Sequence, residues 1–381
     1  MAFNESLTTP CRWTHCRVPG VQMEIRKSRV PHCPRIVAIG TATPGHDIHK
    51  AFIDWAAARL TDRRDKAVFA RMAARSGIAH RWSVLPVGEK GGSPVDSGGF
   101  YAPGMPGTAA RMALYADAAP ELALRAIAEL PEVRGITHLV VASCTGFVAP
   151  GIDQIIATRL GLDGSVERTL IGFMGCYAAV TALKAARHIV RSEPDARVLV
   201  VTVELSTLHL QDDLTIEPLL AMLQFGDGAA AAIVTASGSG FALEAPFAAT
   251  LPDSSGLIRW NIGDTGFAMH LSGEVPARLA TALAVPETRA ALTGGVEPQS
   301  VDAWAVHAGG RSILDAVEIA LDLVPETLAA SRAVLNDNGN MSSSTLMFVL
   351  QRLFADKPKS GVALAFGPGL AAEGLRFGWV D

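Results

Sequence analysis

The sequence predicts an α/β protein with a duplicated, layered body in which two halves rich in strands and helices face each other. Three observations support this prediction. Short apolar runs such as residues 198–203 are nearly uninterrupted, as expected for strands of a sheet covered on both faces. Alanine-rich segments of helical length follow several of these runs. The order of elements in the first half recurs in the last third, so the duplication is inferred from this order and not from residue identity.

The first elements are predicted from an apolar run and the residues that end it. Residues 35–40 predict a buried strand, which ends at the turn sequence Thr43-Pro44-Gly45. Residues 47–76 are predicted to be helical, with arginine and lysine side chains along them. Residues 84–107 contain many glycines and prolines, so a long loop is expected there.

Helices and strands then alternate. Residues 110–130 are rich in alanine and leucine and predict a helix, and residues 138–143 predict a second buried strand. Pro150-Gly151 begins another helix. A short segment ends at Gly175, and the alanine-rich residues 176–190 predict the helix that leads to strand 198–203.

The rest of the chain repeats this logic. Phe225-Gly226-Asp227-Gly228 precedes a strand of small residues at 229–234. The last third is predicted to contain strands at 301–306, 361–366 and 375–380 and helices at 309–321 and 341–354. We therefore expect an N-terminal extension over 1–33 that is flexible, a first half over 34–236 and a second half over 237–381.

Composition excludes several functional classes. The chain has 381 residues, 49% of them hydrophobic and 18% charged, which allows a large core. Its net charge is 33 − 37 = −4 and no basic run stands out, which argues against nucleic acid as the main partner. No apolar run is long enough to span a membrane, and the first thirty residues lack the apolar core of a signal peptide.

Cysteine usage indicates a reducing compartment. The five cysteines are an odd number in a long chain, so a disulfide framework is not expected and a cytoplasmic location fits better. Cys11, His15, Cys16 and His32 are metal-ligand types, but their spacing matches no zinc pattern. No metal site is therefore predicted.

Three separated residues carry the candidate chemistry: Cys176, His307 and Asn340. Each follows a predicted strand or a glycine turn and precedes a helix. Taken singly, they are as well explained by a packed cysteine, a core histidine and a helix-capping asparagine. Together they suit acyl transfer, because histidine activates a cysteine nucleophile and histidine with asparagine can stabilise an enolate oxygen. We expected the Cys176 thiol pKa to be lowered by the helix N-terminus and an imidazolium. This chemistry requires no metal, flavin or nicotinamide cofactor.

The chain resembles the type III polyketide synthases of the chalcone and stilbene synthase family, over roughly residues 34–381. The resemblance implies a thiolase-like fold with α-β-α-β-α layers. Any one of the shared motifs is weak, but all of them in this order are highly specific. They are Gly175-Cys176, Phe225-Gly226-Asp227-Gly228-Ala229-Ala230, His307-Ala308-Gly309-Gly310, Gly339-Asn340-Met341-Ser342-Ser343 and Phe366-Gly367-Pro368-Gly369-Leu370.

The resemblance implies a role for each catalytic residue. Cys176 would carry the starter acyl group and the growing chain, while His307 and Asn340 would support decarboxylation of malonyl-CoA. Phe225 matches a gatekeeper phenylalanine, and Met269 stands where the family has a second one. Three further positions match the cavity wall: Ser342, Gly367 and Gly369.

Other cavity positions depart from the plant pattern. Cys144 stands where plant enzymes have threonine, as in several bacterial relatives, and His209 and Trp260 replace smaller residues. Ala149 stands where a methionine crosses from the neighbouring subunit of the family's homodimer. The segment 259–267 resembles bacterial members that extend fatty acyl starters to alkylpyrones or alkylresorcinols.

The family also implies partners. Malonyl-CoA and an acyl-CoA starter would be the substrates, and Arg71 and Arg75 match two of three basic residues that contact the CoA phosphates. The third position is Val68, and a solvated helix face is the simpler explanation for the two arginines.

Two other functions remain open from the residues. A ketoacyl synthase of fatty acid initiation shares the Cys–His–Asn set but condenses once and docks a carrier protein. A non-catalytic binding protein on the thiolase fold would be expected to lack one of the three residues.

Overall fold

A nine-stranded mixed sheet forms the frame of the computed structural model, which describes residues 33–88 and 92–381. The strand order is β11-β12-β13-β8-β1-β7-β6-β4-β5. The strands preceding residue 236 are β1 (Arg35–Ala42), β4 (His138–Ser143), β5 (Glu167–Gly172), β6 (Val198–Leu205) and β7 (Asp227–Thr235). The later strands are β8 (Gly240–Thr250), β11 (Ala303–Val306), β12 (Gly361–Gly367) and β13 (Ala371–Val380).

The sheet consists of two wings joined at one corner. β1 and β8 pair only through Arg35 with Ala242 and Ile36 with Phe241, whereas β1 and β7 pair along most of their length. The first wing is β5-β4-β6-β7-β1 and the second is β8-β13-β12-β11. The division expected at residue 236 falls in the turn between β7 and β8.

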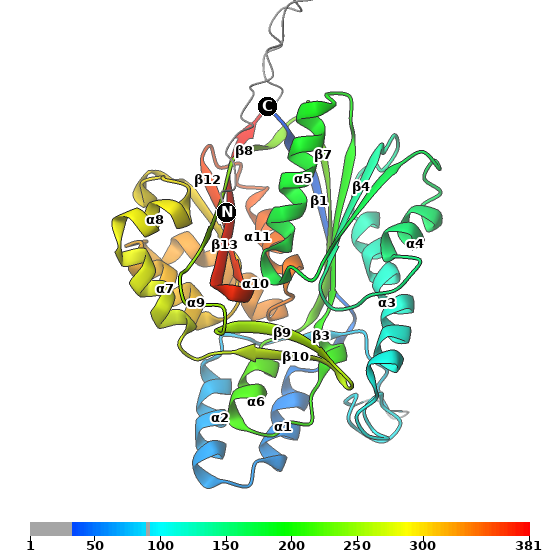
Figure 1. Ribbon diagram of the computed structural model, residues 1–381, viewed down its shortest axis with the longest axis vertical. Helices are drawn as coiled ribbons and strands as arrows, with labels where there is room; N and C mark the ends of the chain where they lie inside the picture. The colour runs from blue at the N-terminus through cyan, green and yellow to red at the C-terminus, as the bar shows by residue number, and fades with distance from the viewer. Residues whose placement is uncertain (1–32, 89–91) are drawn as a thin grey trace, which may run out of the picture. The chain divides into compact units, whose positions relative to one another are not determined.

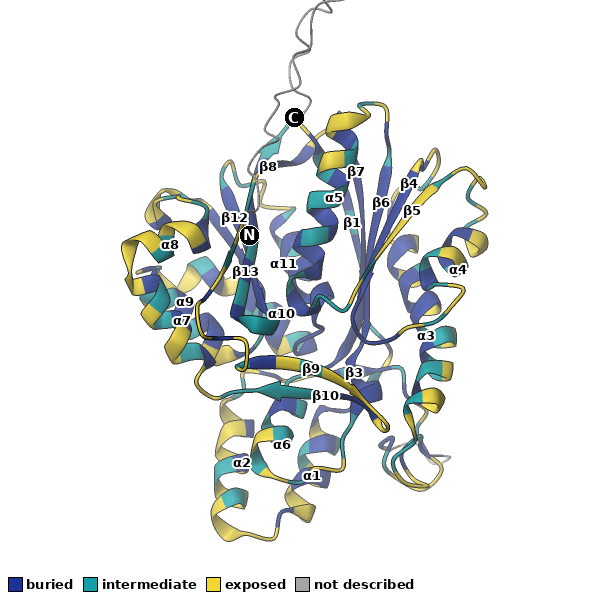
Figure 2. Ribbon diagram, viewed as in Figure 1, coloured by how far each residue is buried: buried dark blue, intermediate teal, exposed yellow. Residues whose placement is uncertain are grey.

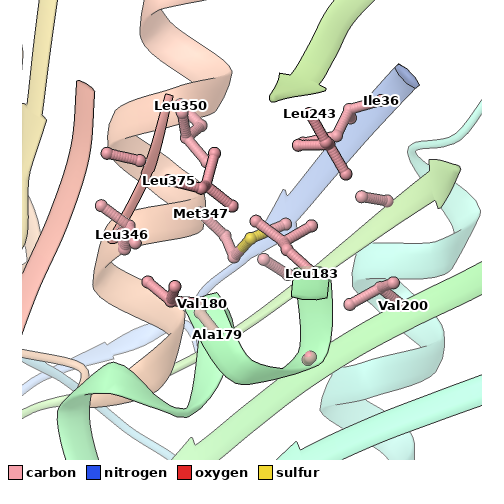
Figure 3. Packing of buried hydrophobic residues seen from close by; sticks show 14 of the residues in the cluster. Ile36, Ala179, Val180, Leu183, Val200, Leu243, Leu346, Met347, Leu350 and Leu375 are labelled. Atoms are coloured by element: carbon pink, nitrogen blue, oxygen red, sulfur yellow. The ribbon is translucent and has the colours of Figure 1, made fainter. Parts of the chain in front are cut away.

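Two helices fill the space between the wings. α5 (Ala178–Ser192) and α11 (Ser343–Leu353) run through the middle of the body (Figure 1). The face of α5 toward the wings is mostly alanine, which allows close approach, and Leu183 packs with Met347 of α11 in the core cluster (Figure 3). Ile36 and Leu243 from the two joined strands complete the same cluster. Burial on both faces explains the uninterrupted apolar runs of the strands.

Outer helices cover the remaining faces. α3 (Thr108–Ala128) and α4 (Ile152–Arg159) pack on the first wing. α7 (Val275–Ala284), α8 (Pro286–Thr293), α9 (Arg311–Ala320) and α10 (Ala329–Asn338) lie on the side of the second. Burial increases from these outer helices to the central layer (Figure 2). The predicted layered α/β fold class is confirmed.

A third group of elements lies beside the two wings. α1 (His49–Arg59), α2 (Arg63–Arg75) and α6 (Ile216–Met222) pack together next to the hairpin of β9 (Ile258–Gly263) and β10 (Gly266–Leu271) (Figure 1). The short strands β2 (His46–Asp47) and β3 (Trp82–Ser83) pair near these helices. Neither α6 nor the hairpin was predicted from the sequence.

The segment 47–76, predicted to be helical, forms two helices, α1 and α2. The helix ends at Arg59 and a new one begins at Arg63, because the Asp62 carboxylate accepts hydrogen bonds from the backbone N–H groups of Arg64 and Asp65, at 2.7 and 2.9 Å. An aspartate in this position starts a helix and does not continue one.

Smaller differences concern boundaries and unassigned segments. Cys176 lies in a 3₁₀ turn, Gly175–Tyr177, directly before α5, whereas the helix was expected to begin at residue 176. The described part of the 84–107 loop forms turns only, as predicted. The extension 1–33, apart from Cys33, and the cysteine–histidine group up to His32 lie outside the described residues. Among the described residues, no helix is long and apolar enough to cross a membrane.

Candidate active site

Cys176, His307 and Asn340 line one cavity of about 370 Å³, here called the triad cavity. Cys176 follows β5, His307 follows β11, and Asn340 lies between α10 and α11. Asn340 is held in place by a bridge to the segment before β7. Its backbone N–H donates to the Gln224 carbonyl at 2.8 Å, and its carbonyl accepts from the Gly226 N–H at 3.0 Å. The ends of strands from both wings thus meet at one place.

The turn that holds Cys176 is pressed against the Gly367–Leu370 loop. Gly175 has φ +74°, and a Cβ added there would lie 2.5 Å from Pro368 Cδ. A Cβ on Gly367 would lie 2.7 Å from the Tyr177 ring and 3.4 Å from the Cys176 backbone nitrogen. Two glycines therefore allow the loop to approach the nucleophile. Gly367 lines the triad cavity, whereas Gly369, with φ +72°, shapes the loop and does not line it.

The expected lowering of the Cys176 thiol pKa is wrong for this structure. Burial raises the pKa of Cys176 to about 12, and hydrogen bonding by Ser342 and Asn340 and the Glu204 charge act less strongly. The desolvation of a thiolate in this cavity outweighs the donors around it. The thiol is neutral, and its proton must leave as it attacks.

His307 lines the same cavity and is the candidate to accept that proton. Its side chain is 1% exposed, and neither ring nitrogen has a hydrogen-bond partner among the described residues. Burial lowers the pKa of His307 to about 3, so the imidazole is neutral. A buried polar ring with two unsatisfied nitrogens is costly unless a ligand completes it.

The Asn340 amide is fixed at both ends. Its Oδ1 accepts from the Ser342 N–H at 2.8 Å, and its Nδ2 donates to the Gly309 carbonyl at 3.1 Å. The remaining Nδ2 hydrogen is directed at Cys176, whose pKa it lowers. The helix α11 starts after Ser342, and no side chain caps it, so capping does not explain Asn340. Ser342 itself has φ +47°, a strained conformation typical of functional sites.

Phe225 and Met269 stand between two cavities. Both line the triad cavity, and both also line a narrower one of about 80 Å³, here called the apolar cavity. Its other walls come from α1, the 84–107 loop and α6, and include Phe52, Trp55, Leu85, Val95 and Met222. This position between two spaces is the one expected of gate residues.

His209 and Trp260 form a rigid wall of the apolar cavity. Nε2 of His209 donates to the Thr145 carbonyl at 2.7 Å, and its Nδ1 accepts from the Phe267 N–H at 3.0 Å. Burial lowers the pKa of His209 to about 3, so it is neutral. Trp260 Nε1 donates to the Cys144 carbonyl at 2.9 Å. These bonds hold both bulky side chains in place.

Cys144 lines neither cavity. Its Sγ lies 3.2 Å from Ser342 Oγ and 3.4 Å from Glu204 Oε2, and burial raises the pKa of its thiol. The side chain is buried, and its thiol is neutral. Ser342 lies between Cys144 and Cys176 and interacts with both.

Glu204 was not singled out in the sequence. It is fully buried, accepts from the Cys144 N–H at 3.0 Å and from Thr145 Oγ1 at 3.0 Å, and also bonds Ser343. Burial raises its pKa to about 7. An acid directly after the apolar run 198–203 was the signal that could have revealed it.

A third cavity of about 390 Å³ shares Met72 and Ser312 with the triad cavity; we call it the arginine cavity because Arg75 and Arg311 line it. Arg311, the first residue of α9, was not predicted as a site residue, although a cation shortly after His307 was visible in the sequence.

Arg71 is exposed on α2 and lines none of these three cavities. Ala149 is exposed on the loop before α4 and lines none of them either.

Comparison with known proteins agrees with this geometry. Residues 23–238 match the N-terminal domain of chalcone and stilbene synthases, and residues 242–380 match the C-terminal domain. The crystal structure of PKS-I from the brown alga Ectocarpus siliculosus is similar, with 29% sequence identity and a TM-score of 0.83. The match covers 93% of this chain and all of that one.

A second solved structure is the C-terminal type III polyketide synthase domain of Steely1, a type I/III hybrid from Dictyostelium. It is 25% identical over 92% of this chain and all of that one, with a TM-score of 0.81. The two domain matches together span most of the chain. This protein belongs to the chalcone and stilbene synthase family, with the fold of the type III polyketide synthases.

Proposed function

We propose that the protein is an acyltransferase that condenses malonyl-CoA repeatedly onto an acyl-CoA starter held on Cys176. The family uses malonyl-CoA and acyl-CoA thioesters, and the proposed activity is the family's. The observation that carries the proposal is that Cys176, His307 and Asn340 line one cavity, in which neither His307 nitrogen has a hydrogen-bond partner from the described part of the chain.

Loading follows from the neutral thiol and neutral imidazole. As Cys176 Sγ attacks the starter thioester carbon, its proton passes to His307. The bond to the CoA sulfur breaks, and CoA leaves as the thiol with that proton. The product is an acyl group on Cys176 and a neutral His307.

Extension uses the same donors. In malonyl-CoA the bond to the free carboxylate breaks, CO₂ leaves, and the electron pair forms an enolate. The N–H of neutral His307 and the free Nδ2 hydrogen of Asn340 donate to the enolate oxygen. The enolate carbon attacks the acyl carbon on Cys176, the bond to Cys176 Sγ breaks, and the sulfur leaves as a thiolate that takes a proton from solvent. The extended chain is now a CoA thioester and is loaded again onto Cys176 as described above. The cycle repeats before cyclisation to a pyrone, resorcinol or phloroglucinol-type product.

The starter that we favour is a fatty acyl group. The apolar cavity beyond Phe225 and Met269 is narrow and lined mainly by side chains such as Phe52, Trp55 and Leu85. Apolar walls bind an alkyl tail by excluding water from it. Methionine in place of a second gate phenylalanine gives a flexible, unbranched side chain at the entrance.

Two further parts of the proposal concern binding of the CoA phosphates and formation of a homodimer. Arg75 and Arg311 would bind the CoA phosphates at the outer end of the arginine cavity, since guanidinium groups suit phosphate. A homodimer would bury the open edge of β5, the last strand of the sheet, where Leu170 and nearby Phe147 are each 42% exposed.

The test is mass spectrometry of products from the purified protein with malonyl-CoA and a series of starters: none, acetyl-, hexanoyl-, lauroyl-, palmitoyl- and 4-coumaroyl-CoA. Triketide or tetraketide products from lauroyl- and palmitoyl-CoA are expected. Cys176→Ala should abolish extension, whereas Cys33→Ala, an exposed cysteine, should not. Full product formation by Cys176→Ala would refute the mechanism. A single condensation that requires carrier protein would instead favour a ketoacyl synthase.

A further inference from the structure

A histidine and two glutamates converge on the first wing, at the end of α5 that lies opposite Cys176. His138 is the first residue of β4, Glu167 is the first residue of β5, and the two are paired in the parallel ladder. Glu193 is the C-cap residue of α5. One nitrogen and two carboxylate oxygens from these residues lie within 4.8 Å of one another.

The imidazole of His138 is buried and held in one orientation. Its side chain is only 7% exposed, and its Nδ1 lies 2.8 Å from the Thr137 hydroxyl. That hydroxyl donates to the Arg197 carbonyl at 3.3 Å and accepts from the Arg197 N–H at 3.0 Å. The hydroxyl's single proton is thereby used, so we assign the donated proton to Nδ1. Nε2 then carries a lone pair, as in a histidine that ligates a metal.

Nε2 is directed at the two carboxylates without a hydrogen bond to either. The distances are 3.8 Å to Glu167 Oε2 and 3.9 Å to Glu193 Oε2, beyond the range of a hydrogen bond. Two ligands of one tetrahedral zinc ion, each bonded at about 2.0–2.2 Å, lie roughly 3.4 Å apart. The glutamate side chains are 75% and 58% exposed, so a small rotation brings their oxygens to that spacing.

The local charge favours a cation. Two carboxylates lie beside the C-terminal end of α5, where the unpaired carbonyls add partial negative charge. Within residues 33–88 and 92–381, His138 is the one basic side chain within 4.0 Å of either carboxylate. A lone pair facing two carboxylates is repulsive unless a positive charge lies between them.

We propose that His138, Glu167 and Glu193 bind a divalent transition-metal cation of the zinc type, with solvent completing the coordination. Imidazole with carboxylate oxygens is a donor set that zinc accepts, whereas magnesium and calcium prefer oxygen alone. The ion would tie the end of α5 to β4 and β5, and α5 begins beside the nucleophile. This site is independent of the proposed condensing activity.

The experiment uses the full-length protein, stripped with EDTA and dialysed, and titrated with zinc chloride by calorimetry and in thermal unfolding. Wild type is expected to bind one zinc ion, and both His138→Asn and Glu193→Gln should reduce the affinity for it more than tenfold. The midpoint of unfolding should rise by several degrees with zinc in wild type and in the control below, but in neither of these two variants. His188→Asn, an exposed histidine on the same helix, is the matched control and should behave as wild type.

The absorption spectrum of bound cobalt distinguishes this site from one in which cysteines bind the metal. Cobalt bound by nitrogen and oxygen lacks the sulfur charge-transfer band that a thiolate ligand produces, and the site should titrate without it. Equal zinc binding by wild type and Glu193→Gln overturns the proposal, because the metal then lies elsewhere. If zinc does not raise the midpoint of unfolding of wild type, the proposal is also overturned, and the three residues form ion pairs only.

Discussion

Among residues 33–88 and 92–381, both nitrogens of His307 lie buried without a hydrogen-bond partner, while both nitrogens of His209 are hydrogen-bonded. The two imidazoles are equally neutral, with pKa values of about 3. At the scale of single residues, this contrast separates a group that awaits substrate from one that builds a wall. It also gives opposite expectations for replacing each ring by an apolar side chain.

His307→Leu should stabilise the protein while it abolishes product formation. Removing an unsatisfied buried polar group is expected to raise the free energy of unfolding by about 1 kcal/mol. His209→Leu, the matched change, should lower it by about 1–3 kcal/mol, because Thr145 and Phe267 lose their partner. Urea unfolding measures both. A loss of stability in His307→Leu equal to that in His209→Leu would show that His307 is a bonded core residue.

Met269→Phe should shift the starter preference toward shorter acyl chains. A rigid ring opposite Phe225 narrows the passage between the triad cavity and the apolar cavity. The ratio of kcat/KM for hexanoyl-CoA over palmitoyl-CoA should rise at least tenfold. Leu271→Phe adds comparable bulk on the same strand but faces only the triad cavity, so this ratio should stay near wild type. If Met269→Phe has the same starter preference as wild type, Met269 is not a gate residue.

At the scale of elements, α2 and α9 meet at the arginine cavity. The Arg311 guanidinium donates to the Arg75 carbonyl at 3.4 Å, so the ends of both helices present cations at one place. The break at Asp62 sets the direction of α2 and therefore the position of Arg75. The proposed CoA-binding site therefore depends on the placement of α2 and α9, which are distant in sequence.

Arg311→Gln should raise KM for malonyl-CoA about fivefold with kcat nearly unchanged, as expected from the loss of about 1 kcal/mol of phosphate binding. The effect should shrink with added salt, since the guanidinium is half exposed. Arg191→Gln on the exposed side of α5 is the control. If KM is unchanged while kcat falls, Arg311 acts on structure and not on CoA.

At the scale of the whole molecule, buried titrating groups couple the fold to pH. His307 and His209 have pKa values of about 3, below the ordinary 6.5, so the unfolded chain protonates them first as pH falls. Glu204 and Asp227 have pKa values of about 7 and 6, above 4.5 and 3.8, so the folded chain protonates these first. His49, whose pKa burial lowers to about 4, is a third group of the first kind, so between pH 6 and 5 the unfolded chain binds about one proton more than the folded chain.

The free energy of unfolding should therefore fall steadily between pH 6 and 4, by roughly 1 to 2 kcal/mol per pH unit, because the unfolded chain binds about one proton more than the folded chain at these groups. Urea unfolding at several pH values measures this. Glu204→Gln removes one opposing group, so its stability should fall more steeply than that of wild type between pH 6 and 5. A wild-type stability that does not change in that range would contradict these pKa shifts.

Local pattern and the family motifs were enough to predict the buried strands and to select the candidate reacting groups. The strand 138–143 was predicted to the residue, because a strand covered on both faces is apolar throughout. Cys176, His307 and Asn340 stood out because each chemistry-bearing residue follows a strand or glycine turn, and the family motifs around them are specific.

Tertiary structure alone decided what surrounds them. Glu204, Arg311 and the two-cavity position of Phe225 and Met269 depend on segments that pack together from distant parts of the chain. The pKa of the Cys176 thiol is raised where a lowered pKa was expected, because burial is a property of the packed cavity and not of the local turn. Sequence determines which groups are present and which strands are buried. Packing determines their charge, their neighbours and the shape of the space between them, because desolvation and contact arise only when distant segments meet.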